Sequence, residues 1–556
     1  MDVVLVGLPG TGKTEVGRRL AAGLRATFID TDREVEAATG RSIDDVFRTD
    51  GQAAFRALDG AIVAGIGSAD PGATVARVIA TGGGTVIDPR NRWQLYRGRR
   101  VFWLDAPTSV LAGRLRRSPT VRPLLAAGDP EAGLDALRVA RDRFYAPGER
   151  IDAGGTVAAT VTAIEAALGR GAAPTPLLRA NLSIGRVVIG EGIAASAIDG
   201  EVRRLGGARR IVLATEPRAL AAIGDGILGE LGQRGWAIEI VELPEGEPAK
   251  RMAIAEVGAA QLARLRVERD EPIVALGGGA LTDAAGFIAS IYQRGIPWVA
   301  VPTTLLGQLD AAHGGKTGLD LDEGKNLVGT FHLPAAVIVD PALLAALPER
   351  HRRAGLVEAV KDGVLGDERL LEVLEVDGPT IAAGAETAEP SALAEIVERA
   401  AWVKLEAVEA DPTEQGDRIK LNLGHTLGHA IEAAAGYGPV LHGEAVAYGL
   451  RAAVRLGRHV GVTPAYRGER IEALLDRLAL AVDPLPYPLE EVLDVLATDK
   501  KRRAGALRWV LPTADGWTVS GDLPMSLVRE VAASVLAGRG VAVVAAVGGA
   551  AAGTAR

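Results

Sequence analysis

Short apolar runs alternate with amphipathic stretches in the first part of the chain and predict a small α/β unit. The runs Val3–Val6, Val78–Ala80 and Val101–Leu104 read as strands, and the stretches between them repeat apolar residues at helical spacing. Strands that alternate with helices in this way pack as a parallel sheet. This unit spans residues 1–168, and the Gly- and Pro-rich segment 169–179 predicts a linker.

The second part of the chain repeats the alternation and then changes to helix. Five apolar runs predict further strands, namely Ile211–Ala214, Ala237–Val241, Ile273–Leu276, Val299–Val301 and Val337–Val339. Residues 180–341 are therefore expected to form a second α/β domain. Residues 342–536 are expected to be mostly helical, with one late strand at Leu507–Leu511, and the Ala- and Gly-rich residues 537–556 predict a low-complexity tail.

Composition narrows the classes of function. A chain of 556 residues is too long for one hydrophobic core, and its net charge of −8 excludes the basic surface typical of nucleic-acid binding. No apolar run has the length of a membrane span, and the N-terminus enters a strand directly, so we expect a cytoplasmic protein without membrane contact. The absence of cysteine excludes disulfides and thiolate chemistry, so any transition metal must be bound by carboxylates and the seven histidines.

The segment Gly7–Thr14 has the spacing G-x-x-x-x-G-K-T and lies between the first strand and the helical pattern Glu15–Leu24. In such a loop the glycines turn backbone N–H groups toward a polyphosphate, Lys13 binds the β and γ oxygens, and Thr14 coordinates Mg²⁺. The strand before the loop and the helix after it argue against a chance match. The first unit therefore predicts binding of a nucleoside triphosphate with Mg²⁺.

Further clusters narrow the acceptor of the phosphoryl group. Asp30 and Asp32 end a strand-like run, where carboxylates hold Mg²⁺ or a substrate hydroxyl, or only cap the following helix. Gly82–Gly84 follows a strand at a place where the backbone approaches a ligand closely. Arg56 and Arg122 have the side chain that suits a planar carboxylate or a transferring phosphate, although any single arginine could be a solvated surface residue.

The order of these motifs resembles shikimate kinase across nearly all of residues 1–168. The resemblance implies ATP-dependent phosphorylation of shikimate to shikimate 3-phosphate, with Lys13, Asp32 and a lid arginine, Arg122, in catalysis. It assigns ATP to Gly10, Thr11, Gly12, Lys13, Thr14 and Arg117; Mg²⁺ to Thr14 and Asp30; and shikimate to Asp32, Arg56, Gly82, Gly83, Gly84 and Arg141. The family usually has Glu where Gln52 and Asp59 stand, and the lid after Arg117 is short. The alternative is a nucleotide-binding module without turnover.

Two features of the second half point to a cofactor and a metal. The buried-strand pattern before Gly277–Gly279 suits a pyrophosphate cradle, or a tight turn that serves packing only. His425 and His429 are four residues apart on one helix face, and His442 opens the next helix. Two histidines and a carboxylate such as Glu358 are what a catalytic Zn²⁺ or a similar ion requires, whereas structural histidines are the alternative. Lysines and arginines near these motifs predict a substrate with phosphate and carboxylate groups.

The series of motifs from Gly277 to L-H-G-E (441–444) resembles 3-dehydroquinate synthase over about residues 180–530. The resemblance implies conversion of 3-deoxy-D-arabino-heptulosonate 7-phosphate to 3-dehydroquinate and phosphate, with NAD oxidising and then re-reducing the substrate. It also implies a Rossmann-like NAD-binding α/β domain, a mostly α-helical metal-binding domain, and a homodimer in which Arg294 reaches phosphate across the interface.

The resemblance assigns a role to each motif residue of this half. The metal, Zn²⁺ or Co²⁺, falls to Glu358, His425 and His442. Catalysis falls to Lys316, Lys361, Arg418 and His429. NAD is assigned to Glu247, Lys250, Gly278, Gly279, Asp283, Thr303, Thr304 and Lys325. The heptulosonate phosphate is assigned to Arg294, Asp310, Lys316, Asn326, Lys361, Arg418, Asn422, His429 and Lys500.

Some positions depart from the pattern of that family. Thr282 stands for a usual Gly, residues near the adenosine ribose differ at Thr215 and Glu216, and His313 is unusual and is expected to be a loop residue rather than a fourth ligand. The alternatives for this half are another sugar-phosphate cyclase or a metal-dependent polyol dehydrogenase. A plain dehydrogenase would not need the predicted phosphate-binding cations.

Overall fold

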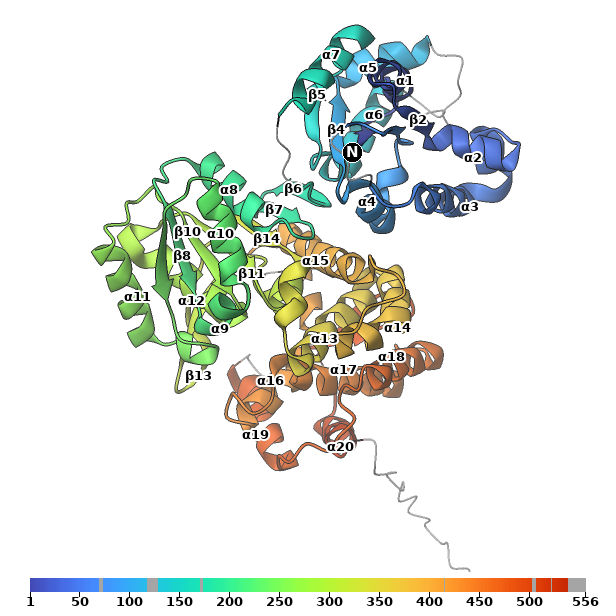
Figure 1. Ribbon diagram of the computed structural model, residues 1–556. Helices are drawn as coiled ribbons and strands as arrows, with labels where there is room; N and C mark the ends of the chain where they lie inside the picture. The colour runs from blue at the N-terminus through green and yellow to red at the C-terminus, as the bar shows by residue number, and fades with distance from the viewer. Residues whose placement is uncertain are drawn as a thin grey trace, which may run out of the picture. The chain divides into compact units, whose positions relative to one another are not determined.

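The computed structural model in Figure 1 describes residues 1–69, 74–117, 129–170, 174–414, 416–502, 507–521 and 523–538, without the side chains of 499–502. The chain forms two compact units. Unit 1 combines residues 1–348 with 386–412, and unit 2 combines 349–385 with the described residues after 412. Arg122 and nearly all of the expected tail lie outside the described residues. Among the described residues, no helix is both long and apolar enough to cross a membrane.

Unit 1 begins with a five-stranded parallel sheet of order β2-β3-β1-β4-β5. Its strands are β1 (Asp2–Val6), β2 (Thr27–Asp30), β3 (Arg77–Ala80), β4 (Arg100–Asp105) and β5 (Glu149–Asp152). β1 is buried along its whole length, as expected for a central parallel strand that is covered on both faces. The parallel sheet is confirmed; β5 was not expected, because only Ile151 is apolar in its four residues.

Helices follow each strand of this sheet. They are α1 (Lys13–Leu24), α2 (Thr31–Thr39), α3 (Ile43–Ile66), α4 (Pro89–Tyr96), α5 (Thr108–Arg116), α6 (Pro130–Tyr145) and α7 (Val157–Leu168), with a short 3₁₀ turn η1 (Thr85–Ile87) before α4. Apolar residues of α1 and α7 pack on one face of the sheet, for example Leu20 and Ile164 against Leu5 and Phe102. The carboxyl ends of the central strands are left to the loops that carry the glycine motifs.

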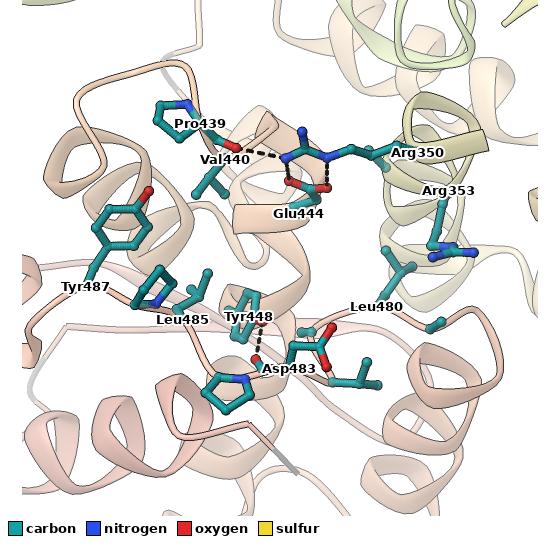
Figure 2. A pocket seen from close by; sticks show the side chains of 16 residues that line it. Arg350, Arg353, Pro439, Val440, Glu444, Tyr448, Leu480, Asp483, Leu485 and Tyr487 are labelled. Carbon is teal, nitrogen blue, oxygen red and sulfur yellow. Dashed lines mark hydrogen bonds and ion pairs between the residues drawn. The ribbon is translucent and has the colours of Figure 1, made fainter. Parts of the chain in front are cut away.

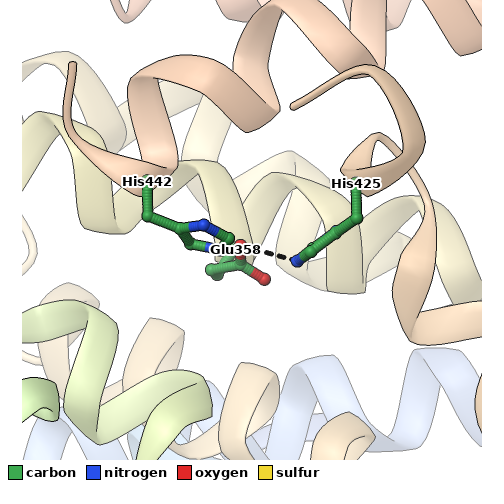
Figure 3. Close-up of side chains that lie close together, drawn as sticks. All are labelled: Glu358, His425 and His442. Atoms are coloured by element: carbon green, nitrogen blue, oxygen red, sulfur yellow. Dashed lines mark ion pairs between the residues drawn. The ribbon is translucent and has the colours of Figure 1, made fainter. Parts of the chain in front are cut away.

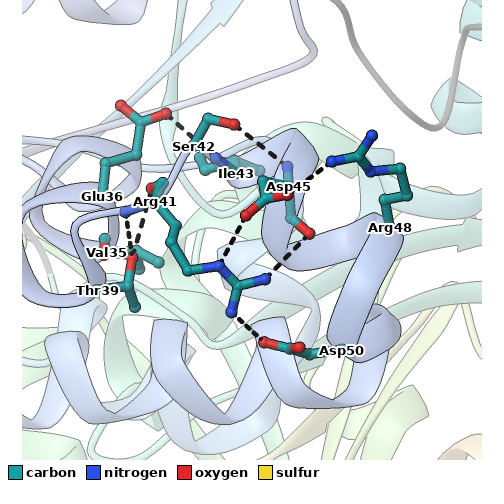
Figure 4. Close-up of polar contacts among 9 residues, drawn as sticks. All are labelled: Val35, Glu36, Thr39, Arg41, Ser42, Ile43, Asp45, Arg48 and Asp50. Atoms are coloured by element: carbon teal, nitrogen blue, oxygen red, sulfur yellow. Dashed lines mark hydrogen bonds and ion pairs between the residues drawn. The ribbon is translucent and has the colours of Figure 1, made fainter.

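The corner between α2 and α3 is held by a cluster of charged side chains (Figure 4). Arg41 donates from Nε to Asp45 Oδ2 at 2.8 Å and from Nη1 to Asp50 Oδ2 at 2.6 Å. Ser42 caps α3 by accepting from the backbone N–H of Asp45 at 3.2 Å. The helix then bends at Gly51, whose φ of 83° and ψ of 172° are not helical. Arg41 thus joins the first turn of α3 to Asp50, the residue directly before this bend.

The second sheet of unit 1 has seven strands in the order β6-β7-β14-β11-β10-β8-β9, of which only the β6–β7 pair is antiparallel. The strands are β6 (Leu178–Leu182), β7 (Gly185–Ile189), β8 (Ile211–Thr215), β9 (Ile238–Glu242), β10 (Ile273–Gly277), β11 (Trp298–Pro302) and β14 (Ala336–Val339). The five predicted strands of this region are confirmed with small shifts at their ends. The β6–β7 hairpin was not expected, since Arg179, Asn181 and Arg186 interrupt its apolar runs.

Helices and one hairpin complete unit 1. The α-helices are α8 (Ala194–Leu205), α9 (Pro217–Ala219), α10 (Asp225–Gln233), α11 (Met252–Arg264), α12 (Gly279–Ile291) and α15 (Ala392–Ala410). Short 3₁₀ or π turns are η3 (Leu220–Gly224), η4 (Glu247–Ala249), η5 (Tyr292–Arg294), η6 (Gly307–Ala311) and η7 (Pro341–Ala346). The antiparallel hairpin consists of β12 (Lys316–Leu321) and β13 (Gly324–Phe331).

Unit 2 is mostly helical, as predicted. It contains α13 (Glu349–Gly366), α14 (Glu368–Ala383), η8 (Asp417–Asn422), α16 (His425–Ala434), α17 (His442–His459), α18 (Ala465–Arg477), α19 (Leu489–Arg502) and α20 (Met525–Leu536). The late strand is β15 (Trp509–Pro512), paired with β16 (Trp517–Ser520). Residues 354–365 of α13 are all buried, so the charged side chains in this stretch lie in the interior. Such charges require partners, which makes α13 the natural place for a site.

Candidate active sites

The loop after β1 has the backbone of a phosphate cradle. Gly10 and Gly12 both have φ of 87°, a conformation that glycine adopts without strain. Lys13 begins α1, and its Nζ donates to the carbonyl oxygens of Gly7 at 2.7 Å and Leu8 at 3.1 Å. The lysine therefore lies over the loop with its charge where a triphosphate would bind.

Thr14 and Asp30 meet beside this loop. Thr14 Oγ1 donates to Asp30 Oδ2 at 2.7 Å, and Asp30 is nearly buried at the end of β2. Asp30 Oδ1 also accepts from the backbone N–H of Arg33 at 3.3 Å, so it caps α2 as well. The capping role of Asp30 is confirmed. Its Mg²⁺ role stays a prediction, for which a hydroxyl and a carboxylate lie together.

The glycine segment Gly82–Gly84 lies against two predicted substrate residues. A Cβ added at Gly82 would come within 2.3 Å of Asp32 Oδ1, and one added at Gly84 within 2.2 Å of Arg56 Nη2. With Asp32 and Arg56 in these positions, a side chain at Gly82 or Gly84 would displace them. The opposite charges of Asp32 and Arg56 therefore flank a backbone segment that a small ligand can approach.

Arg141 completes this cluster from α6. It is buried, and its Nη1 donates to the carbonyl oxygen of Gly83 at 2.9 Å. Tyr145, one turn later on α6, also donates from its hydroxyl to Gly83 O. Two arginines, Arg56 and Arg141, thus converge on one glycine segment, as carboxylate binding requires.

Asp59, to which no site role was assigned, positions Arg56. Its carboxylate is fully buried, accepts from Thr85 Oγ1 at 2.9 Å, and pairs with Arg56 Nη1 at 3.3 Å. Burial raises the pKa of Asp59 to about 6, against the lowering effects of Thr85 and Arg56. The signal in the sequence was its place one turn after Arg56, where the resembled family has Glu.

Two other residues, Thr11 and Arg117, were predicted to bind ATP. Thr11 is buried in the loop, where its Oγ1 donates to Leu8 O at 2.8 Å. Arg117 is exposed at the end of α5, and Arg114 on the same helix donates to the carbonyl of Gly10 at 3.3 Å. The adenine-stacking role of Arg117 stays a prediction.

In the second sheet, β10 runs into the glycines at the start of α12. Gly278 is the N-cap of this helix, and its backbone N–H donates to Glu216 Oε1 at 2.9 Å. Glu216 Oε2 accepts from the N–H of Gly246 at 3.2 Å, so one carboxylate ties the loops after β8, β9 and β10. Thr303, buried after β11, donates its N–H to Gly277 O at 2.9 Å. The carboxyl ends of the parallel strands thus form the cleft edge that a dinucleotide prefers.

A network of charges gathers four predicted NAD residues and one substrate residue. Lys250 Nζ donates to Asp283 Oδ2 at 2.7 Å and to Asn326 Oδ1, and Lys325 Nζ pairs with Glu247 Oε1 at 3.0 Å. Burial raises the pKa of Asp283 to about 6, and Lys250 opposes this effect. These side chains come from η4 and the residue that follows it, from α12 and from β13, so the β12–β13 hairpin contributes directly to the site.

Asp310 and Lys404 form an ion pair at 2.8 Å between η6 and α15. Lys404 is largely buried and was not among the predicted residues, because it lies in an ordinary helical pattern far along the chain. Thr304, just before η6, accepts from the N–H of Gly307 through Oγ1 at 3.1 Å. Gly279 faces Ala311, with 3.2 Å between an added Cβ and the alanine Cβ. Asp310 is thus held by a neighbouring helix.

Three other predicted positions in unit 1 differ in exposure. Lys316 is exposed at the start of β12. Arg294 is exposed on η5 and has φ of 67°, after Gln293 with φ of 47°, so two non-glycine residues hold a left-handed turn. His313 is buried, its Nε2 lies 2.8 Å from Gln308 O, and burial lowers its pKa to about 4. His313 therefore stays neutral at pH 7 and serves the packing of η6. Thr282 fits inside α12, with Oγ1 donating to Gly279 O at 2.9 Å.

Glu358, His425 and His442 of unit 2 converge as predicted (Figure 3). Glu358 Oε1 lies 3.8 Å from His425 Nε2 and 3.7 Å from His442 Nε2. One ligand atom from each residue lies within 4.8 Å of the others. The side chains come from α13 and from the first residues of α16 and α17. Two nitrogens and one carboxylate oxygen at this spacing suit a metal with open coordination positions.

The second nitrogen of each histidine is held by a neighbour. His425 Nδ1 lies 3.1 Å from Leu423 O, and His442 Nδ1 lies 2.9 Å from Glu432 Oε2. Each Nε2 therefore faces Glu358, as expected when an outer carboxylate or carbonyl fixes the tautomer of a metal-binding histidine. Glu432 was not predicted as a site residue, although it ends the motif N-L-G-H-T-L-G-H-A-I-E.

The chemistry of Glu358 supports a cation. Glu358 is fully buried, and Oε2 accepts from Lys361 Nζ one turn later on α13. Within the described part of the chain, Oε1 has no hydrogen-bond donor. A buried carboxylate oxygen without a donor is costly, and a divalent ion at this position would remove that cost. The residues present therefore fit a metal.

The remaining substrate candidates of unit 2 lie on η8, α16 and α19. Arg418 is buried on η8, and Asn422 Nδ2 donates to Glu414 Oε1 at 3.3 Å. The ring of His429 lies 5.3 Å from that of His425 and 5.8 Å from that of His442, between centroids. Lys500 is in α19, but its side chain lies outside the described residues. His429 thus lies beside Glu358, His425 and His442, here called the metal set, and is not one of these three residues.

A cavity of about 450 Å³ lies where α13 and α17 are joined (Figure 2). Along one side, Arg350 donates from Nε and Nη2 to the two carboxylate oxygens of Glu444 at 2.6 and 2.7 Å. Glu444 Oε2 also accepts from the N–H of Leu441 at 2.9 Å and thereby caps α17. The helix that carries Glu358 is therefore clamped to the first turn of the helix that begins at His442.

Known proteins match both halves of the chain. A family model described as shikimate kinase matches residues 9–161, and models described as 3-dehydroquinate synthase N-terminal and C-terminal match 240–354 and 355–502. A 3-dehydroquinate synthase from Symbiobacterium thermophilum is 41% identical over 340 residues, which cover 60% of this chain and 92% of that protein.

Two solved structures share the fold of the second half. The 2-epi-5-epi-valiolone synthase ValA from Streptomyces hygroscopicus, with NAD⁺ and Zn²⁺ bound, is 28% identical, with a TM-score of 0.55 over 60% of this chain and 94% of ValA. A 2-deoxy-scyllo-inosose synthase is 24% identical, with a TM-score of 0.56 over 64% of this chain and 99% of that one, and shows the fold alone. With these matches on both halves, the chain belongs to the 3-dehydroquinate synthase family, carries a shikimate kinase domain ahead of it, and is a bifunctional enzyme of the shikimate pathway.

Proposed function

We propose that the kinase activity uses the residues gathered around β1 and β3. Lys13 binds the triphosphate, Thr14 and Asp30 hold its Mg²⁺, and Asp32 orients the 3-hydroxyl of shikimate for attack. Arg56 and Arg141 bind the shikimate carboxylate across Gly82–Gly84. The observation that carries this assignment is the convergence of one carboxylate and two guanidinium groups on the segment Gly82–Gly84, which has no side chain of its own.

Substitution of Arg56 tests the assignment. In full-length protein, Arg56→Lys is expected to raise the KM for shikimate by roughly tenfold, because a lysine cannot reproduce a planar paired contact with a carboxylate. ADP release that depends on shikimate would be measured at saturating ATP. An unchanged KM would reject the proposed site. Arg122 and Arg117 keep their predicted roles in the lid and at adenine.

For the synthase activity, we infer that Glu358, His425 and His442 hold Zn²⁺ or Co²⁺ and that NAD binds along β10 and α12. When bound, the metal would polarise the substrate oxygen while NAD⁺ takes a hydride from the alcohol, and NADH would later return the hydride to the ketone so formed. The support is the buried, undonated oxygen of Glu358 together with the two Nε2 atoms that face it. The relative ValA, described with NAD⁺ and Zn²⁺ bound, also supports this pair of cofactors.

The chain's own residues supply binding and proton control. Lys316, Lys361 and Arg418 are proposed to bind phosphate and carboxylate groups of the heptulosonate, and His429 to move a proton beside the metal set. Asp310, held by Lys404, accepts from substrate hydroxyls. Fixed charges of this kind stabilise the negative charge that develops on the substrate during oxidation and elimination.

Phosphate release tests the synthase assignment. With heptulosonate 7-phosphate and NAD⁺ in trace amount, phosphate released should greatly exceed the NAD⁺ supplied, because the cofactor is regenerated in each cycle. Chelation should abolish release, and Zn²⁺ or Co²⁺ should restore it. Stoichiometric NADH without phosphate would instead favour a polyol dehydrogenase, which the 41% identity to a 3-dehydroquinate synthase does not favour.

The assembly and location of the protein are also proposals. We propose a homodimer through the synthase half, in which the exposed Arg294 reaches the substrate phosphate of the partner. Its support is that Arg294 is exposed and lies in a left-handed turn without a glycine at that position. We also propose the domain limits 1–168, 180–341 and 342–536, and a cytoplasmic location.

A further inference from the structure

Arg92 supports the turn that follows the shikimate-binding segment. It lies on α4, is fully buried, and donates from Nη1 to the carbonyl oxygens of Val86 and Ile87. These are the last two residues of η1, which begins directly after Gly82–Gly84. The Arg92 guanidinium carbon lies 4.3 Å from the centre of the Phe144 ring. Arg92 thus fixes the end of η1, the turn that directly follows the glycine segment lying against Asp32 and Arg56.

The charge of Arg92 is balanced from the synthase half. Its Nη2 donates to Oε1 of Glu398, a buried residue of α15 that is 306 positions away in the chain. One turn earlier on α15, Glu395 Oε2 accepts from Arg90 Nε at 2.6 Å. A buried ion pair of this kind is specific, because either charge alone would be stranded in the interior.

Further contacts make this an extended interface, here called the α4–α15 interface. Arg143 at the end of α6 lies over the ring of Trp402, with 4.0 Å between its guanidinium carbon and the ring centre. Trp93 Nε1 donates to Glu191 Oε2 at 2.9 Å. In the two ion pairs, Arg92–Glu398 and Arg90–Glu395, the kinase side contributes the arginine and the synthase side the glutamate, so these contacts are complementary in charge.

The same helix reaches a proposed residue of the synthase site. Lys404, six positions after Glu398 on α15, pairs with Asp310 of η6. The middle of α15 therefore contacts both the support of the shikimate segment, through Glu398, and a proposed heptulosonate-binding residue, through Lys404 less than two turns later. Within unit 1, the kinase part and the proposed synthase site thus both contact α15.

We propose that Glu398 is a positioning residue of the kinase: it holds Arg92, and Arg92 in turn sets the turn η1 and the glycine segment that binds shikimate. The inference rests on the shikimate-binding role proposed for Gly82–Gly84. It makes shikimate affinity dependent on a helix of the synthase half. By linkage, if the Arg92–Glu398 contact strengthens shikimate binding, bound shikimate must strengthen the contact of α15 with Arg92 by the same free energy.

Full-length Glu398→Gln tests the proposal, because it keeps the size of the side chain and removes its charge. The KM for shikimate should rise roughly tenfold while the KM for ATP stays unchanged, since the triphosphate loop lies on β1 and α1. Glu398→Asp, which restores the charge, should recover part of the loss. The matched control is Glu409→Gln on the same helix, an exposed residue that accepts from the N–H of Ser183 at 3.0 Å.

Several outcomes would overturn the proposal. These are an unchanged KM for shikimate in folded Glu398→Gln, an equal rise in both KM values, or a lower Tm without a change in KM. If Glu398→Gln does not fold, Arg92→Lys provides the same comparison. If Arg56→Lys also left the KM for shikimate unchanged, the assigned shikimate site itself would be at fault; failure of Glu398→Gln alone would reject only the coupling.

Hydrogen exchange on the wild-type chain offers a second test without substitution. Saturating shikimate should slow amide exchange in residues 392–410 of α15, and this protection should be lost in Glu398→Gln. Exchange in α15 that does not respond to shikimate in the wild type would overturn the proposal. Exchange in α18, which also belongs to the synthase half, serves as the internal control.

Discussion

At the scale of single residues, the metal set depends on a carboxylate that is not itself one of the three proposed ligands. Glu432 holds Nδ1 of His442, so that Nε2 faces Glu358. An outer partner of this kind fixes both the tautomer and the orientation of the ring. Its effect should therefore appear in metal affinity before it appears in the fold.

We expect Glu432→Gln to lower the affinity for Zn²⁺ by about 10- to 100-fold. The amide can still meet Nδ1, but it no longer favours a proton there through charge. Competition with a chromophoric chelator would measure the affinity. Glu469→Gln, which changes an exposed glutamate of α18, is the control, and equal affinities in the two variants would contradict the expectation.

Asp59 should give the kinase a pH dependence in the acid range. Its pKa is raised from 3.8 to about 6, so below pH 6 it takes up a proton and no longer holds Arg56 by charge. The KM for shikimate is expected to rise several-fold between pH 7 and pH 5. In Asp59→Asn the KM should be high throughout and nearly independent of pH, and a profile like that of the wild type would contradict this role.

The same shift has the opposite sign for stability. Because the folded pKa lies above the unfolded value, the buried carboxylate favours the folded state least once pH has risen through 6. The Tm of Asp59→Asn relative to that of the wild type should therefore rise as pH goes from about 4 to about 6, the range between the unfolded and the folded pKa. Thermal unfolding of both proteins across this pH range would measure the difference in Tm. A difference that stays constant would argue against the raised pKa.

At the scale of elements, α13 and α17 are joined by a clamp that also caps a helix. Glu444 binds Arg350 and accepts from the N–H of Leu441, whereas Arg350 is more than half exposed. Exposed ion pairs contribute little, and helix caps contribute about 1 kcal/mol. The two partners of the clamp should thus differ in importance.

Glu444→Ala is expected to cost about 1 kcal/mol of unfolding free energy, and Arg350→Ala clearly less. The reason is that only the glutamate substitution also removes the cap of α17. Urea unfolding of the two variants would measure the difference. Equal losses would mean that the ion pair, and not the cap, carries the effect.

Motifs whose residues are close in sequence were predictable, and contacts between distant elements were not. The spacing in Gly7–Thr14 and the four-residue spacing of His425 and His429 each follow from local geometry, and the structure shows the loop and the shared helix face. Lys404 and Glu398 lie in an ordinary helical pattern, and their meaning depends on partners 94 and 306 positions away. No periodicity carries that information. The β12–β13 hairpin was missed for a related reason, since its exposed strand lacks an apolar run.

At the scale of the whole molecule, the metal residues and the kinase residues lie in different units. Removal of Zn²⁺ or Co²⁺ with a chelator, in excess Mg²⁺, should abolish phosphate release and leave ADP release that depends on shikimate unchanged within about twofold. Both activities would be measured on the same sample. Parallel loss of the two would show that unit 1 also requires the metal.

The division of unit 1 into two stretches of chain has a consequence for synthesis on the ribosome. Residues 1–168 emerge first, but α15 ends at residue 410. At about 5–20 residues per second, the kinase part must wait roughly 10–50 s for the helix that balances Arg92. During that interval Arg90 and Arg92, on the kinase side of the α4–α15 interface, lack their glutamate partners and can meet other chains or chaperones. Translation therefore begins the kinase early and completes it only when most of the synthase has been made.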